Sequence, residues 1–578
     1  MFRARPIALA TCLLCAAAAA AQDRYQYPSK VAISWNRLNN YDEVVQICRD
    51  LTNAYPDLLT MRSLGKSVEG RDMWELTLNV ARTGPDTSKP AMYIDANIHG
   101  NEVQGSETVL YTIWYLTKSY GKIDKLTDLM DNNAFYFVPM VNPDGRAYWF
   151  DKPNTAHSSR GGVKPTDNDG DGLFDEDPPN DLNGDGLIEM MRIEDPDGNM
   201  RVSPDDPRVM EPIPPDAKGT FKRYRFLGWE GIDDDGDGRI NEDGVGGYDT
   251  NRNWPADWQP GFIQYGAGEF PLSLPESKSI ADFILAHPNI AAVQSYHNSG
   301  GMILRAPGAK YVEYPRADVR VYDRIGHHGE KILPFYKYMV IWKDLYGVHG
   351  STVNWTAEDL GIISFTNELW TSAKYYMKKQ ERGGFGFNTD MTFTDDLLFG
   401  QTFVPWTQVD HPQLGKVEVG GDIKFTGRVP PPFHLEEECH RNFAFTMYHA
   451  AQMPAVELRN ASVQSLGNNL WRVRIDAHNQ HLIPTTTAQA AKRKVGPRDY
   501  IEISGDNIRV VAGGTLDSSL ANATFHFVEH NPQKLWLDSG VPSEGSVHVQ
   551  WLVTGTGQAK VHFSASRARD QVYDVTLK

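Results

Sequence analysis

The 578-residue chain has few cysteines, no excess of basic residues and, after its first 21 residues, no long hydrophobic run. Two of its four cysteines lie in that N-terminal segment, and the other two, Cys48 and Cys439, are 391 positions apart (439 − 48). Two such cysteines can pair but do not make a disulfide framework. The formal charge of −17 argues against nucleic acid or an anionic membrane as the main partner. After residue 21, no stretch approaches the roughly 18 apolar residues of a membrane-spanning helix.

The first 21 residues are typical of a signal peptide. Arg3 and Arg5 form a basic start, "IALATCLLCAAAAA" is a short apolar segment, and the alanines at 19–21 before Gln22 fit a cleavage site. A membrane anchor is the alternative, but the apolar run is short and ends in small residues. We therefore expect an exported protein, periplasmic or secreted, without a membrane span.

Strand and helix patterns alternate after this segment. Apolar residues recur at helical spacing in "YDEVVQICRDLTNAYP" and "SETVLYTIWYLTKSY", whereas "DMWELTLNV" and "AMYIDANI" read as strands. "NAFYFVPMVNPDG" reads as a further buried strand that ends in a turn. Strands interleaved with helices indicate an α/β sheet covered on both faces.

Two later segments break this alternation. Residues 163–245 are rich in Asp, Gly and Pro and contain three similar loops, after which α/β patterning resumes. From about residue 455 the helical signal disappears, and short alternating strands such as "LWRVRIDA" and "SVHVQWLV" indicate a β-sandwich. We therefore divide the chain into a signal peptide (1–21), an α/β domain (22–454) with an insertion (163–245), and a β-sandwich domain (455–578).

Polar residues with metal-binding chemistry stand at the ends of several strands. His99 and Glu102 follow "AMYIDANI" at positions i and i+3, so both side chains can face one point. A second strand, "NIAAVQSYH", ends at His297, and a third, "GIISFTNELW", ends at Glu368. Imidazole and carboxylate groups suit zinc, and ligands bind at the carboxyl ends of strands in open α/β sheets.

Taken together, these motifs make the chain, from about residue 37 to 450, resemble the zinc metallocarboxypeptidases of the carboxypeptidase A type. The resemblance includes "VNPDG", "DTNRNW" and the 22-residue spacing (368 − 346) between Tyr346 and Glu368. It implies a mixed, mostly parallel sheet flanked by helices, with His99, Glu102 and His297 as ligands of one catalytic zinc.

The same resemblance implies a role for each remaining site residue. Glu368 would be the general base and then the general acid, and Asp249 would hold the ring of His99 through its second nitrogen. Asn251 and Arg252 would bind the terminal carboxylate of the substrate, since a guanidinium fork matches a carboxylate. Tyr346 would cover the bound substrate.

Three positions bear on how far the resemblance extends. The family's oxyanion arginine has no securely spaced counterpart, and we prefer Arg160 in "HSSRGG" to Arg239. Asn101 lies between the ligands where digestive members have an arginine, which puts contacts beyond the terminal residue in doubt. Val353 matches the floor of the family's specificity pocket and favours apolar or aromatic terminal side chains.

The three acidic loops of the insertion each begin like an EF-hand calcium loop, with oxygen side chains at positions 1, 3 and 5 and glycine at position 6. These oxygen donors are Asp167, Asp169 and Asp171; Asp181, Asn183 and Asp185; and Asp233, Asp235 and Asp237. Position 12, a glutamate in EF-hands, is Pro178, Arg192 or Gly244, and acidic residues at positions 9 to 11 can substitute. We expect structural calcium here that orders the neighbouring "GGYDTNRNW" segment; a flexible acidic insertion is the alternative.

We therefore interpret the sequence as that of an exported zinc carboxypeptidase with a calcium-binding insertion and a C-terminal β-domain. Its substrate would be a peptide or protein with a free C-terminal carboxylate. The alternatives are an amidopeptidase that uses the same site on peptidoglycan stem peptides and a noncatalytic peptide-binding module with the same fold.

Overall fold

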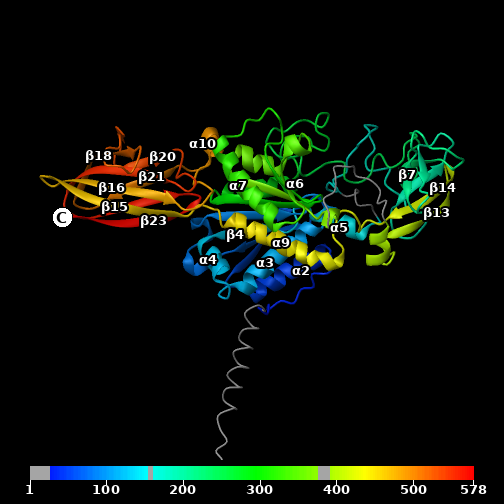
Figure 1. Ribbon diagram of the computed structural model, residues 1–578, viewed down its shortest axis with the longest axis horizontal. Coiled ribbons are helices and arrows are strands. Elements are labelled where there is room, and N and C mark those ends of the chain that lie inside the picture. Colours follow the sequence, from blue (N-terminus) through cyan, green and yellow to red (C-terminus); the bar gives the residue numbers. More distant parts are fainter. Residues whose placement is uncertain (1–26, 154–159, 375–390) are drawn as a thin grey trace, which may run out of the picture.

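The structure, a computed structural model, describes residues 27–153, 160–374 and 391–578, so the expected signal peptide lies outside the described residues. Figure 1 shows three parts in a row: a central α/β part, a smaller β-rich part around β7, β13 and β14, and a C-terminal β part at the opposite end.

The centre of the molecule is an eight-stranded sheet with the order β1-β2-β4-β3-β9-β12-β10-β11. Its strands are β1 (Leu59–Lys66), β2 (Asp72–Leu78), β3 (Ala91–Ala96), β4 (Ala134–Val138), β9 (Ile290–Asn298), β10 (Met302–Arg305), β11 (Lys337–Val340) and β12 (Ile363–Leu369). The run β4-β3-β9-β12 is parallel, as is the β10–β11 pair, whereas the other three pairings are antiparallel. The expected mixed, mostly parallel sheet is confirmed.

Helices cover both faces of this sheet. They are α2 (Tyr41–Ala54), α3 (Gln104–Ser119), α4 (Asp124–Asn132), α5 (Pro143–Asp151), α6 (Pro275–Ala286), α7 (Arg316–Ile332), α8 (Thr352–Asn354) and α9 (Pro432–Ala450). Side chains from α2, α3, α7 and α9 share one buried cluster with the sheet, and α6 packs into another with Trp254 and Trp355. The expected helix in "YDEVVQICRDLTNAYP" is α2, which begins at a capping box between Asn40 and Glu43.

Short helical turns complete the α/β part. They are η1 (Ala81–Thr83), η2 (Asp86–Ser88), η3 (Ile341–Leu345), η4 (Trp355–Asp359), η5 (Ser372–Lys374) and η6 (Phe393–Leu397).

The "VNPDG" segment forms the start of a helix rather than a simple turn. Asn142 caps α5 by accepting a hydrogen bond from the amide of Gly145 (2.8 Å), and Pro143 occupies the first helical position. An N-cap asparagine followed by proline is a helix-start signal, so the expectation of a turn was incomplete.

The insertion is more ordered than its composition indicates. Four of its segments form strands: β5 (Met190–Glu194), β6 (Met200–Val202), β7 (Met210–Pro212) and β8 (Tyr224–Trp229). They join β13 (Phe403–His411) and β14 (Gly415–Asp422), from a distant part of the sequence, in a six-stranded sheet of order β13-β14-β5-β8-β6-β7. The sequence analysis missed this sheet because its strands are short and come from two separate segments.

The C-terminal part is the expected all-β sandwich. One antiparallel sheet has the order β15-β16-β21-β18-β19 and the other β20-β17-β22-β23, and their inner faces share one hydrophobic cluster. The strands are β15 (Val456–Gly467), β16 (Leu470–Asn479), β17 (Asp499–Ser504), β18 (Ile508–Leu516), β19 (Phe525–Phe527), β20 (Lys534–Leu537), β21 (Ser546–Gly555), β22 (Gly557–Ala565) and β23 (Ala568–Leu577).

One short helix, α10 (Ala488–Arg493), interrupts this β part where we expected none. The hydroxyl of Thr487 caps α10 and also bonds to the carbonyl of Gly361 in the α/β part (2.6 Å). The buried guanidinium of Arg567 donates to the same carbonyl (2.8 Å). These buried polar contacts join the sandwich to the central part.

Cys48 and Cys439 are both buried and do not form a disulfide. Across the described ranges, no helix combines the length and the hydrophobicity needed to cross a membrane.

Candidate active site

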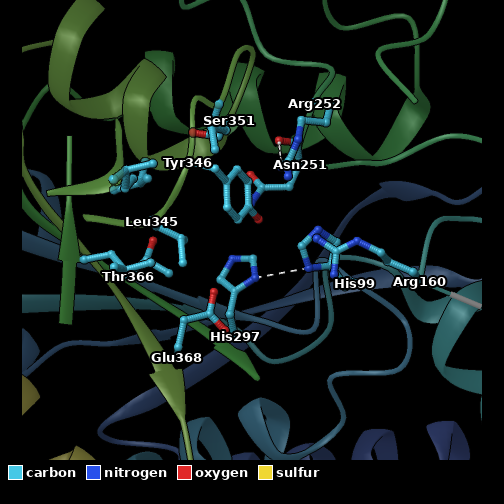
Figure 2. Close-up of a pocket in the computed structure, with 14 residues that line it drawn as sticks. His99, Arg160, Asn251, Arg252, His297, Leu345, Tyr346, Ser351, Thr366 and Glu368 are labelled. Atoms are coloured by element: carbon cyan, nitrogen blue, oxygen red, sulfur yellow. Dashed lines mark hydrogen bonds between the residues drawn. The ribbon is translucent and has the colours of Figure 1, made fainter. Parts of the chain in front are cut away.

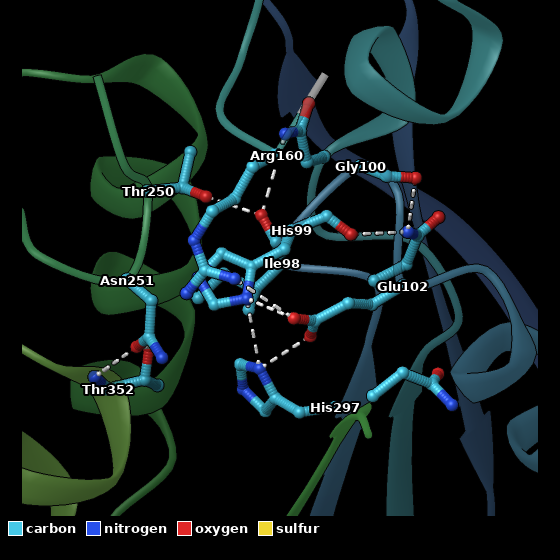
Figure 3. A network of polar contacts seen from close by, with 12 residues as sticks. Ile98, His99, Gly100, Glu102, Arg160, Thr250, Asn251, His297 and Thr352 are labelled. Atoms are coloured by element: carbon cyan, nitrogen blue, oxygen red, sulfur yellow. Dashed lines mark hydrogen bonds and ion pairs between the residues drawn. The ribbon is translucent and has the colours of Figure 1, made fainter. Parts of the chain in front are cut away.

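Three side chains converge at one edge of the central sheet (Figure 3). Nδ1 of His99 lies 3.0 Å from Glu102 Oε1, Nδ1 of His297 lies 2.9 Å from Glu102 Oε2, and the two Nδ1 atoms are 3.2 Å apart. All three side chains are buried. Ligands held at 2.0–2.1 Å around a tetrahedral zinc are about 3.3 Å apart, so the three donor atoms fit one zinc ion. The structure brings together the three residues that the sequence analysis proposes as zinc ligands.

The sheet order explains why residues nearly two hundred positions apart meet here. Strands β3, β9 and β12 are parallel neighbours, so their carboxyl ends share one edge. His99 follows β3, while His297 on β9 pairs in register with Glu368 on β12. Gly105 lets the first turn of α3 approach closely, since a Cβ there would lie 2.9 Å from the Cβ of Ala96.

Asp249 contacts the ring of His99, the position that the family resemblance implies for it. Its Oδ1 lies 3.0 Å from Nε2 of His99 and accepts the backbone amide of Asn251 at 2.8 Å. A proton held on Nε2 leaves the lone pair of Nδ1 directed at the metal position. Burial alone would raise the pKa of Asp249, but the charges of His99, Arg252 and Arg160 hold it well below its usual range.

Glu102 is also kept ionised. Burial opposes its charge, yet His99 and His297 outweigh burial and keep the pKa of Glu102 well below the ordinary value. An ionised carboxylate between two imidazole nitrogens is the charge state that a divalent cation requires of its ligands.

Glu368 lies in the same pocket with a different environment. Burial, and after it the negative charge of Glu102, raise the pKa of Glu368 to about 7. The charges of His297, Arg160 and Arg428 act in the opposite direction. A carboxyl group with a pKa near neutrality is suited to accept and return a proton.

The structure separates the two candidate arginines. Arg160 lines the pocket, with Nη1 3.2 Å from Glu102 Oε1 and Nε 3.3 Å from Asp249 Oδ2. Its carbonyl oxygen also accepts the amide of Gly100 at 3.0 Å. Arg239 is exposed in the third acidic loop, where its nearest ion pair is with Asp237 at 3.7 Å. Only Arg160, of these two, can reach a substrate in this pocket.

Asn251 and Arg252 stand on the side of the pocket opposite Glu368 (Figure 2). Oδ1 of Asn251 accepts a hydrogen bond from the backbone amide of Thr352 at 2.9 Å. The Nδ2 group of Asn251 is therefore the end that can donate to a substrate. Arg252 donates from Nη1 to the carbonyl of Asn251 at 2.9 Å and lies 3.9 Å from Asp249 Oδ2. A buried guanidinium and a carboxamide side by side match the two oxygens of a carboxylate.

The pocket has an apolar wall. Val353 lines it together with Leu304, Ile341 and Val348, and these four belong to one buried hydrophobic cluster. Tyr346 also lines the pocket and is 51% exposed, so its ring has room to move. Asn101, in contrast, is buried and is not among the residues that line the pocket.

Arg428 is a site residue that the sequence analysis missed. It lies between β14 and α9, donates from Nη1 to the carbonyl of Asn298 at 2.9 Å, and lies 3.5 Å from Glu102 Oε1. Nothing in "TGRVPPP" distinguishes this arginine from a surface residue, since its approach to the site depends on the fold alone.

The acidic loops lie outside the pocket and pack against one another. We call them loop 1 (167–177), loop 2 (181–189) and loop 3 (233–243). Four groups of carboxylates close enough to share a cation occur in loops 1 and 3, three of them drawn from both loops; they are Asp167, Asp169 and Asp243; Asp169, Asp237 and Glu242; Asp169, Asp171 and Asp235; and Asp233, Asp235 and Asp237. Asp177 of loop 1 accepts the amides of Asp234 (3.1 Å) and Asn241 (2.8 Å), and Asp243 accepts the amide of Asn168 (3.2 Å). Each of these two loops therefore supplies oxygens to the other.

Comparison with known proteins agrees with this geometry. The family described as zinc carboxypeptidase matches residues 44–175 and 225–385, and a domain family of unknown function matches residues 455–576. Carboxypeptidase D of Drosophila melanogaster is 35% identical over 107 residues, which are 18% of this chain and 8% of that protein. Carboxypeptidase A1 of Mus musculus is 25% identical over 353 residues, which are 58% of this chain and 64% of that protein. The chain therefore spans less than two thirds of the length of either relative.

Among solved structures, the carboxypeptidase A from Helicoverpa armigera is 19% identical, with a TM-score of 0.44 over 75% of this chain and 78% of that one. The family match covers 132 and 161 residues (44–175 and 225–385), or 293 of the 578. The protein is thus a member of the zinc carboxypeptidase family, whose members are metal-dependent hydrolases.

Proposed function

We propose that this protein is an exported carboxypeptidase that removes C-terminal residues from peptides. The observation that carries the proposal is the layout of one pocket, with His99, His297 and Glu368 on one side and Asn251 with Arg252 on the other. A scissile bond beside the first group places the terminal carboxylate of the last residue against the second.

The reaction divides among the residues as follows. When bound by His99, Glu102 and His297, zinc supplies Lewis-acid polarisation and lowers the pKa of water. Glu368 accepts a proton from the attacking water and later delivers it to the leaving amine, so the peptide bond breaks and water is consumed. Arg160 donates to the carbonyl oxygen of the substrate as that oxygen gains negative charge.

The carboxylate anchor restricts cleavage to the last residue. Arg252 offers a planar set of donors that binds both oxygens of a carboxylate, and Asn251 adds an amide donor. A substrate positioned for cleavage at an internal peptide bond has no carboxylate at this place. The buried guanidinium of Arg252 would then stay unpaired, which disfavours binding of the substrate in that position. Tyr346 covers the bound end of the substrate.

The apolar wall favours apolar terminal side chains. The wall formed by Val353, Leu304, Ile341 and Val348 is apolar, and Glu368 is the one acidic residue among the described residues that line the pocket, so a basic side chain finds no carboxylate in this wall. Burying a leucine- or phenylalanine-sized side chain there contributes about 1.5–3 kcal/mol.

The insertion binds calcium as a structural ion through the oxygen side chains of loops 1, 2 and 3. Support comes from the grouped carboxylates of loops 1 and 3, which repel one another without a cation. Export rests on the N-terminal sequence pattern alone.

The test is hydrolysis of a peptide panel that ends in a free carboxylate or in an amide, assayed with wild type, Glu368→Gln and the buried control Glu276→Gln. We expect release of terminal apolar residues from the free acids only, at least about a hundredfold slower in Glu368→Gln and unchanged in the control. Activity that survives Glu368→Gln, or that ignores the terminal amide, contradicts the proposal. Cleavage confined to muropeptides would assign the site to peptidoglycan stem peptides instead.

A further inference from the structure

Glu230 is a buried carboxylate that forms no ion pair with any residue that the structure describes. It follows strand β8 and stands three residues before loop 3, with none of its surface exposed. Neither of its oxygens has a hydrogen-bond partner of normal geometry among the described residues. Burying a charged or polar group without a partner is costly, so this side chain needs an explanation.

The surroundings of Glu230 make its position more costly still. Its backbone amide donates to the carbonyl of Glu189 at 2.8 Å, which brings the two glutamates side by side. Glu189 is also fully buried, and its Oε1 has no partner among the described residues either. In loop 2, the side-chain amide of Asn183 donates to the other oxygen of Glu189 at 3.4 Å. Burial, and after it the charges of Glu189, Asp181 and Asp185, raise the pKa of Glu230 to about 9.

Loop 2 is already folded as the first half of a calcium loop. The carboxylate of Asp181 accepts the amides of Gly184 (2.7 Å) and Gly186 (2.9 Å), and Oδ1 of Asn183 accepts the amide of Asp185 (2.9 Å). What the loop lacks is the bidentate glutamate of position 12. Arg192 occupies that position, and its side chain instead pairs with Glu418 on β14 at 2.6 Å.

We propose that Glu230 and Glu189 complete a calcium site with Asp181, Asn183 and Asp185, with Glu230 supplying from a separate segment the carboxylate that loop 2 lacks. An all-oxygen donor set of five side chains, four of them acidic, is the ligand chemistry of Ca²⁺. Transition metals would favour nitrogen or sulfur donors, and loop 2 contains neither histidine nor cysteine.

This site specifies ligands for the calcium binding that is proposed above for the insertion, and it does not depend on the peptidase reaction. Because Glu230 precedes loop 3 and the amide of Ile232 donates to Asn180 at 2.8 Å, an ion here joins the start of loop 3 to loop 2. Loops 1 and 3 exchange oxygens in the same manner, so each of the three loops draws a carboxylate from outside itself.

The experiment compares full-length wild type with Glu230→Gln and Glu189→Gln, each loaded with zinc and freed of calcium by passage over a chelating resin. Bound calcium and zinc are counted in the same samples after equilibrium dialysis, and melting temperatures are recorded with and without added CaCl₂. Glu276→Gln on α6 is the matched control, because it also removes a buried carboxyl group, but one that accepts the amide of Val68 at 3.2 Å.

We expect each loop-2 variant to bind one calcium ion fewer than wild type, or to bind the weakest one roughly tenfold or more less tightly. The isosteric glutamine removes repulsion among the carboxylates, so without calcium the variants should have a higher melting temperature than wild type. With calcium, they should have a lower melting temperature than wild type, because a ligand of the ion is lost. The control should keep the wild-type calcium count. An unchanged count and a melting temperature that calcium does not shift would show that Glu230 is simply a protonated buried acid.

The two variants make the test robust to a folding failure in one of them. If Glu230→Gln does not fold, Glu189→Gln must still show the reversal in melting order, and its absence overturns the site. Calcium counting requires no peptidase activity, so failure of this site and failure of the proposed reaction are distinguishable.

Discussion

Substituting Arg252 with alanine should remove the distinction between a free C-terminal carboxylate and a C-terminal amide. The guanidinium is 9% exposed, and one of its five N–H donors is used by the carbonyl of Asn251. Nη1 also lies 3.9 Å from Asp249 Oδ2, and Arg252 lines the pocket, so its guanidinium can donate to a ligand that enters there. A neutral amide terminus carries no negative charge that could pair with this buried guanidinium.

The size of the effect follows from the hydrogen bonds involved. A hydrogen bond to a charged group contributes about 1.5–3 kcal/mol, so a bidentate pair supplies about 3–6 kcal/mol before desolvation of the carboxylate is subtracted. We therefore expect a coupling of about 3 kcal/mol between Arg252 and the substrate carboxylate, or about 150-fold in kcat/KM. Arg252→Lys should lie between wild type and alanine, because it keeps the charge but loses the fork.

The assay is a double-mutant cycle with two enzymes and two substrates. Wild type and Arg252→Ala are each tested on one peptide as free acid and as amide, and four kcat/KM values give the coupling energy. Arg239→Ala removes an equal charge from an exposed position outside the pocket and should leave the acid preference intact. The assignment of the carboxylate anchor is refuted if Arg252→Ala still prefers the acid as strongly as wild type.

Three further predictions concern other parts of the molecule. Arg160→Lys should lower kcat about 10²–10³-fold in steady-state assays, whereas Arg239→Lys should leave kcat unchanged. Equal effects of the two substitutions would contradict the assignment of Arg160 as the oxyanion donor. Asp249→Asn should weaken zinc binding by His99 about 10–100-fold in competition with a chelator, because the ring loses its orienting carboxylate; unchanged affinity would contradict that role. Burial raises the pKa of Glu358 to about 7 from 4.5, so stability should fall by about 3 kcal/mol as pH rises from 4.5 through 7. Glu358→Gln should flatten that part of the denaturation profile, and an unchanged slope would show that Glu358 is not responsible.

Much of the active site could be predicted because each chemical group ends a recognisable strand. His99, His297 and Glu368 each follow an apolar run, and parallel strands bring such ends to one edge. The sequence does not state which strands are neighbours. The register that sets Glu368 opposite His297 is a property of the folded sheet.

Other contacts lay beyond sequence reasoning because they join segments without local signals. Arg428 reaches Glu102 across 326 positions, and Arg192 meets Glu418 across 226. Glu230 sits in "WEGIDDD", where a single glutamate before an acidic loop has no distinguishing pattern. In each case the partner is chosen by tertiary packing, so periodicity and spacing carry no information about it.

The insertion and the candidate active site share a border. Arg160 stands seven residues before Asp167, and Asp249 stands six residues after Asp243. Loops 1 and 3 are tied together by the hydrogen bonds that join Asn168 to Asp243 at 2.9 and 3.2 Å. The two ends of the insertion therefore enter and leave the pocket beside each other, and the 3.3 Å contact between Arg160 and Asp249 closes that junction. Under the calcium binding proposed above, cations that neutralise the loop carboxylates would act on the same segments that hold Asp249 against His99 and place Arg252 in the pocket lining.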